Sequence, residues 1–138
     1  MISKAIKEAY RLKAERNWDT LYFAVDLHGT IIEPGRLISL SPYPKAKEAL
    51  QYLCTHEDII LILFTSTKQE MLEEFYIWCT QNQIRFKYFN TNPECANTHE
   101  GDYAQKFYYN VLLDDRAGFD PLTDWDQVIT TMREICGE

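Results

Sequence analysis

The stretch "LYFAVDLHGTII", residues 21–32, decides the fold of this chain. Its first five residues form an apolar run, which is typical of a strand in a parallel sheet that is covered on both faces. The carboxylate of Asp26 stands where this strand should end, and Gly29-Thr30 follows as a turn signal. Ligands of open parallel sheets bind outside the carboxyl ends of the strands. The stretch therefore predicts a buried strand that presents an acid to a binding site.

Strands and helices are expected to alternate along the rest of the chain. Strands are predicted at 21–25, 58–66, 84–89 and 110–115, and helices at 4–16, 44–55, 68–82 and 124–136. Ser3 and Asp124 are the expected N-caps of the first and last helices. A turn at Pro34-Gly35 would close a short hairpin over 31–40, which would form a flap beside the first strand.

This alternation predicts a single α/β domain over residues 1–138, in which residues 1–18 are an N-terminal helical extension. The expected class is three-layer and Rossmann-like, with a mostly parallel sheet, helices on both faces and no large cap domain. The third helix should turn a set of apolar residues toward the core. These residues are Met71, Leu72, Phe75, Trp78 and Cys79.

Charge, hydropathy and cysteine spacing limit the function classes. A net charge of −7 argues against strong nucleic-acid binding, because the chain and the phosphate backbone would repel each other. No run reaches the roughly 18 to 20 apolar residues that a membrane span needs, so no membrane contact and a cytoplasmic location are expected. Cys54, Cys79, Cys95 and Cys136 form no Cys-x-x-Cys pair, which predicts free thiols and no zinc spacing. His56 is expected at a helix end in a structural role.

Polar side chains end three of the predicted strands. Asp26 ends the first, Thr65 the second, and Asp114-Asp115 the last. Each residue alone could be an ordinary turn or cap residue. Together they would place two or three carboxylates at one edge of the sheet, where they repel each other unless a cation lies between them. Oxygen ligands of this kind suit Mg²⁺, which takes one or two carboxylates and keeps several waters.

Four segments carry a family resemblance. "FAVDLHGT" resembles the first motif of the haloacid dehalogenase-like (HAD) hydrolases, an apolar strand followed by Asp-x-Asp-Gly-Thr, and "LILFTS" is similar to their second motif. Lys106 stands at the place of the third-motif lysine, and "NVLLDD" resembles the fourth motif. The "LDDR" form is also similar to the phosphatase domains of polynucleotide kinases and to small bacterial HAD proteins. The resemblance covers about residues 20–120.

The resemblance implies a nucleophile and a metal site. Asp26 would attack phosphorus and form an aspartyl-phosphate. Asp26 and Asp114 would bind Mg²⁺ directly, the main-chain carbonyl of His28 would be a third ligand, and Asp115 would act directly or through water.

The resemblance also implies residues that contact the substrate. Thr65 would hydrogen-bond a phosphoryl oxygen, and Lys106 would offset the charge of the phosphate as it transfers. The same lysine could also be an ordinary surface residue ahead of a strand. The further residues expected around the phosphate are Gly29, Thr30, Ser66 and Arg116.

His28 departs from the family pattern. The second aspartate of the first motif protonates the leaving group and later activates water, and this chain has histidine at that position. General acid/base catalysis contributes about 10²- to 10⁴-fold, and histidine is its commonest agent because it titrates near neutral pH. Two interpretations stay open: His28 is a working acid/base, or the domain has kept its fold and metal site and lost turnover.

The spacing between motifs leaves no room for a cap. A capless site implies a phosphorylated substrate that is large or exposed, such as a polymer end or a protein, or a cap contributed by a partner subunit in an oligomer. The polar loop 90–105, with His99, Glu100 and Asp102, could shape the opening. A catalytically silent domain that binds a partner or a phosphorylated ligand is the alternative function. A receiver-like phosphoacceptor role for Asp26 fits less well, because there the phosphoacceptor ends a later strand.

Overall fold

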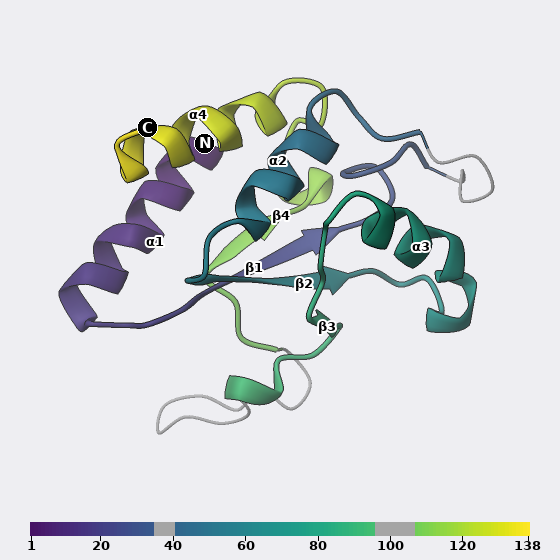
Figure 1. The fold of residues 1–138 in the computed structure, drawn as a ribbon, viewed down its shortest axis with the longest axis horizontal. Helices are drawn as coiled ribbons and strands as arrows, with labels where there is room; N and C mark the ends of the chain where they lie inside the picture. The colour runs from purple at the N-terminus through teal and green to yellow at the C-terminus, as the bar shows by residue number, and fades with distance from the viewer. Residues whose placement is uncertain (35–40, 96–106) are drawn as a thin grey trace.

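The structure, a computed structural model, describes residues 1–34, 41–95 and 107–138 (Figure 1). The helices are α1 (Ile2–Arg16), α2 (Ala46–Cys54), α3 (Glu73–Gln81) and α4 (Asp124–Cys136), and the strands are β1 (Leu21–Asp26), β2 (Ile59–Phe64), β3 (Tyr88–Phe89) and β4 (Val111–Leu113). Three short 3-10 helices are η1 (Gln69–Met71), η2 (Pro93–Cys95) and η3 (Asp115–Ala117).

The strands form one parallel sheet in the order β3-β2-β1-β4. The central strand β1 pairs with β2 from Leu21↔Ile59 to Asp26↔Phe64, and with β4 through Phe23↔Val111. Because all strands run the same way, the residues that follow β1, β2 and β4 meet at one edge of the sheet. The predicted α/β class with a parallel sheet is confirmed, and the described residues contain no large cap domain.

The larger hydrophobic cluster lies between the sheet and the helices. Alternate strand residues such as Phe23 and Leu63 point into it, as the two-residue period of a strand requires. All four helices contribute to it, and α2 buries four residues at helical spacing: Ala46, Ala49, Leu50 and Leu53. The largest fully buried side chain is Trp125 of α4. No helix in the described ranges has the length and apolarity needed to cross a membrane.

A smaller cluster covers the opposite face of the sheet. It contains Tyr22, Ala24, Ile62 and Phe107. In the described part of the chain, the side chains that cover this face come from η2 and from residues 107–109 rather than from a long helix. The two clusters lie on opposite faces of the sheet in a Rossmann-like arrangement. All four described α-helices pack into the larger cluster, so among the described residues the helices expected on both faces are found on one face.

The helix starts differ from the predicted ones. α1 begins at Ile2 with Met1 as N-cap, so Ser3 lies inside the first turn and is not the cap. The N-cap of α4 is Thr123, and Asp124 is the first helical residue. Its carboxylate still accepts a backbone hydrogen bond, from the N–H of Asp120 at 2.8 Å, so it closes the turn that precedes the helix. The start of α4 depends on this preceding turn, which residue type alone does not specify.

Two further elements are shorter than predicted. The helix expected over 68–82 divides into η1 and α3, and Met71 is 60% exposed rather than buried, because η1 turns it away from the core. The strand expected over 84–89 pairs with β2 only at Tyr88 and Phe89, since it is the edge strand. Residues 35–40 of the predicted flap lie outside the described residues. Its arms pair through hydrogen bonds from the N–H of Glu33 to the Ser41 carbonyl and from that of Tyr43 to the Ile31 carbonyl.

Candidate active site

Three carboxylates converge at the carboxyl edge of the sheet. Asp26 ends β1, and Asp114 and Asp115 follow β4. Each offers one oxygen, and the three oxygens lie within 4.8 Å of one another. None of the ion pairs among residues 1–34, 41–95 and 107–138 includes one of these acids. Hard carboxylate oxygens that form no ion pair among the described residues are a donor set that fits Mg²⁺.

The hydroxyl of Thr30 connects two of these acids. Thr30 is fully buried, and its Oγ1 lies 3.0 Å from Oδ2 of Asp26 and 3.2 Å from Oδ1 of Asp115. The same oxygen accepts the backbone N–H of Asp115 at 3.0 Å, and the Thr30 carbonyl accepts the indole N–H of Trp125 at 2.8 Å. A hydroxyl has one hydrogen, so it donates to one carboxylate at a time. Thr30 therefore holds Asp26 and Asp115 in position from the protein interior, and it does not line the pocket.

Gly29 has to be glycine for two reasons. Its φ is +86°, a conformation that side chains with a Cβ rarely adopt. A Cβ built at this position would lie 2.7 Å from Oδ2 of Asp115, closer than such atoms approach. The turn predicted at this residue is confirmed, and it brings the backbone directly against a carboxylate of the site.

The neighbouring acids and burial change the acidity of Asp26. Burial is the main cause, and the negative charge of Asp114 adds to it, so that the pKa of Asp26 rises to about 7 in the metal-free protein. The hydrogen bond from Thr30 acts in the opposite direction, and the contact with Asp115 raises the pKa further.

This raised pKa predicts how stability depends on pH. In the unfolded chain Asp26 titrates near its usual pKa of about 4, so its stabilising effect on the folded state is complete below about pH 4 and is lost as the pH rises through about 7. Above pH 7 the ionised carboxylate of Asp26 destabilises the folded, metal-free protein. Bound Mg²⁺ should restore the stability in this pH range. The measurement is thermal unfolding from pH 5 to 8 with a chelator and with Mg²⁺, for the wild type and Asp26→Asn. Equal pH dependence in the two proteins would contradict this assignment.

A pocket of about 390 Å³ opens beside the three acids. It is lined by Asp26, His28, Phe64, Thr65, Ser66, Asn90, Asp114 and Arg116. The structure thus brings together six of the site residues that the sequence predicts at the ends of three separate strands, and Ser66 and Arg116 among them are exposed. Lys106 lies outside the described residues, as do His99, Glu100 and Asp102.

Asn90 is a site residue that the sequence analysis missed. Its side chain forms two hydrogen bonds with the backbone of Thr65: its Nδ2 donates to the Thr65 carbonyl at 2.6 Å, and its Oδ1 accepts the Thr65 N–H at 2.9 Å. Its own φ is +53°, which asparagine tolerates better than most residues. The sequence signal is an asparagine directly after the third predicted strand, a position that the pattern places in the polar loop 90–105. Asn90 fixes the backbone that carries the Thr65 hydroxyl.

His28 lies on the pocket wall in an unusual environment. Its Nδ1 is buried and has no hydrogen-bond partner in the described parts of the chain. Buried polar atoms are nearly always paired, because an unpaired one costs about 1–3 kcal/mol. An unpaired imidazole nitrogen beside a pocket is a candidate for a functional contact.

A larger pocket, of about 600 Å³, lies at the opposite end of the sheet. Its lining includes Trp18, Asp19, Tyr22 and Asn110. Asp19 is the only acid among the described residues of this lining, whereas three acids meet at the smaller pocket. Chemistry rather than volume therefore selects the pocket at Asp26 as the candidate active site.

Comparisons with known proteins support the fold. No protein-family model matches the chain, and no curated protein matches it. The chain is similar to a solved structure, that of a conserved protein coded by a locus from Bacteroides thetaiotaomicron. The sequences are 28% identical, and the match has a TM-score of 0.63 and covers 83% of this chain and 91% of the other. This similarity assigns no activity.

Proposed function

We propose that this protein is a Mg²⁺-dependent phosphohydrolase of the HAD-like kind, which hydrolyses phosphate esters through an aspartyl-phosphate on Asp26. The observation that carries the proposal is the meeting of Asp26, Asp114 and Asp115 beside a pocket that Thr65 also lines. Three acids in such proximity favour a bound cation, and the Thr65 hydroxyl, which contacts Thr67 Oγ1 at 3.3 Å in this structure, is a hydrogen-bond donor that can turn to a phosphoryl oxygen.

Each residue of the site has a role in this proposal. The Asp26 carboxylate attacks phosphorus, and the bond from phosphorus to the leaving oxygen breaks. Asp26, Asp114 and Asp115 are the carboxylates that would hold Mg²⁺, which when bound offsets the negative charge of the phosphate. Thr65 and Ser66 donate hydrogen bonds to phosphoryl oxygens. His28 gives a proton to the leaving oxygen and then takes one from the water that cleaves the aspartyl-phosphate.

The openness of the pocket supports a substrate class. Arg116 and Ser66 are exposed at its rim, and the described residues form no cap over it. A site of this kind accepts a phosphate group on a large molecule, such as a protein or a polymer end. The Arg116 guanidinium would add a second contact to the phosphate, because its planar donors suit phosphate oxygens.

A second function is a silent domain that binds a phosphorylated ligand or a partner without turnover. The observation that favours it is His28, which stands where the HAD-like motif has its acid/base aspartate and whose Nδ1 is buried without a hydrogen-bond partner among the described residues. The two functions share the metal site and differ in the acid/base step alone.

The first experiment is hydrolysis of an aryl phosphate by the purified protein. Turnover is expected with Mg²⁺, and a chelator should abolish it until Mg²⁺ is added back. The pH should span about 5 to 8, because histidine titrates in this range. Turnover that a chelator leaves unchanged would exclude the metal-dependent reaction. Binding of Mg²⁺ without any turnover would favour the silent domain.

A further inference from the structure

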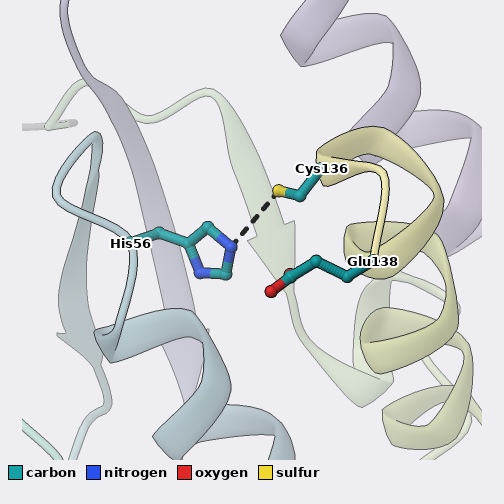
Figure 2. Close-up of side chains that lie close together, drawn as sticks. All are labelled: His56, Cys136 and Glu138. Carbon is teal, nitrogen blue, oxygen red and sulfur yellow. Dashed lines mark hydrogen bonds between the residues drawn. The ribbon is translucent and has the colours of Figure 1, made fainter.

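A second group of metal-ligating side chains lies at the other edge of the sheet. His56 precedes β2, Cys136 is the last residue of α4, and Glu138 follows it; Figure 2 shows the three side chains facing one another. His56 Nε2 lies 3.3 Å from Cys136 Sγ, and one potential ligand atom of each residue lies within 4.8 Å of the others. This cluster is at the amino end of β2, whereas the Asp26 pocket is at the carboxyl end.

The surroundings of His56 leave Nε2 free to bind a metal. Its Nδ1 lies 2.9 Å from the carbonyl oxygen of Tyr52, which can only accept a hydrogen bond. The hydroxyl of Thr55, 3.3 Å from Nδ1, directs its hydrogen to the same carbonyl at 2.6 Å. Nδ1 therefore carries the proton of the neutral ring, and the lone pair is on Nε2, which faces Cys136. A histidine ligand is usually oriented by such a bond from its other nitrogen to a carbonyl.

Glu138 is held in place by two independent contacts. The hydroxyl of Tyr52 donates a hydrogen bond to its carboxylate. Gly137 adopts a φ of +71° at the end of α4, and the Glu138 N–H donates to the Arg133 carbonyl at 2.8 Å. This C-cap turns the chain back so that Glu138 lies beside Cys136. Tyr52 thus orients two members of the cluster, His56 through its carbonyl and Glu138 through its hydroxyl.

We propose that His56 Nε2, Cys136 Sγ and a carboxylate oxygen of Glu138 form a binding site for Zn²⁺ or a similar borderline transition-metal ion. An imidazole, a thiolate and a carboxylate are the ligand types that Zn²⁺ takes, at about 2.0–2.3 Å. In a tetrahedral site these bond lengths separate the nitrogen and the sulfur by about 3.6 Å. The 3.3 Å separation needs to open only slightly. Three protein ligands leave the fourth position to water or an external ligand.

The acidity of the thiol argues against the main alternative, a nucleophilic cysteine paired with His56. Partial burial and the carboxylates of Glu138 and Asp58 raise the pKa of Cys136 above its ordinary value. A reactive cysteine needs a lowered pKa instead. A metal ion would supply the positive charge that stabilises the thiolate here.

The test is titration of the reduced, metal-free protein with Co²⁺, followed through the near-ultraviolet band that arises from thiolate-to-cobalt charge transfer. The acids Asp26, Asp114 and Asp115 would also bind divalent ions under the proposed function, but their pocket has no thiol, so they would give no such band. The band is expected in the wild type, and it should disappear when Zn²⁺ displaces Co²⁺. Cys136→Ser should abolish it and weaken Zn²⁺ binding by about 100-fold or more, whereas the remote Cys95→Ser should leave it unchanged.

Two more variants separate binding from effects on folding. His56→Gln removes a ligand on a different element, and it should also abolish the band. Tyr52→Phe keeps the carbonyl and loses the hydroxyl that orients Glu138, so Zn²⁺ binding should weaken by about 10-fold. Circular dichroism of each metal-free variant checks that it is folded. The absence of the band in the wild type, or its persistence in Cys136→Ser or His56→Gln, would overturn the site.

Discussion

Asp26→Asn is expected to lower the hydrolysis of phosphate esters by about 10⁴-fold or more, as loss of a nucleophile does in other enzymes with covalent intermediates. The amide has no charge to attack phosphorus and is a poorer ligand for Mg²⁺. The side chain keeps its size, so the contact with Thr30 at the end of β1 remains available. The measurement is kcat for an aryl phosphate at saturating Mg²⁺, together with mass spectrometry of acid-quenched protein to detect a phosphoryl group on Asp26.

The matched control is Asp126→Asn. Asp126 is an exposed acid in the first turn of α4, and it does not line the pocket beside Asp26. This change should leave turnover within about twofold of the wild type, because surface substitutions of this kind have small effects. If Asp26→Asn keeps a tenth or more of the wild-type activity, Asp26 is not the nucleophile.

His28→Asn is expected to lower turnover by about 10²- to 10⁴-fold while Mg²⁺ binding is retained, because the change removes proton transfer and leaves the three acids intact. The loss should depend on the leaving group. An alkyl phosphate needs its leaving oxygen protonated more than an aryl phosphate does, so the alkyl ester should lose more activity. The measurement is kcat/KM for both esters in both proteins.

His28→Asp distinguishes the two interpretations of this position. A loss of activity in this variant means that the histidine is the acid/base to which the site is adapted. A large gain from a nearly inactive wild type means that the chain has kept the metal site and lost turnover, and this result supports the silent domain.

For the His28→Asn variant, an equal loss of activity toward the alkyl and aryl esters would exclude His28 as the group that protonates the leaving oxygen.

The sequence by itself determined the class of fold and one edge of its sheet. Buried strands and amphipathic helices leave a periodic pattern of apolar residues, and this pattern predicts β1, β2 and the buried face of α2. Because parallel strands end at a common edge, the polar residues that follow them could be placed together before any contact was known. Asp26, Thr65 and Asp114 line one pocket for this reason.

Contacts between residues far apart in the chain were decided only by the tertiary structure. Thr30 and Asp115 are 85 residues apart, and Asn90 and Thr65 are 25 apart, so no local pattern indicates their hydrogen bonds. Cys136 and His56 are 80 residues apart, and cysteine spacing predicted no metal site. Periodicity records which side of an element is buried, whereas these pairs depend on how α4, β3 and the loop before β2 pack on the sheet.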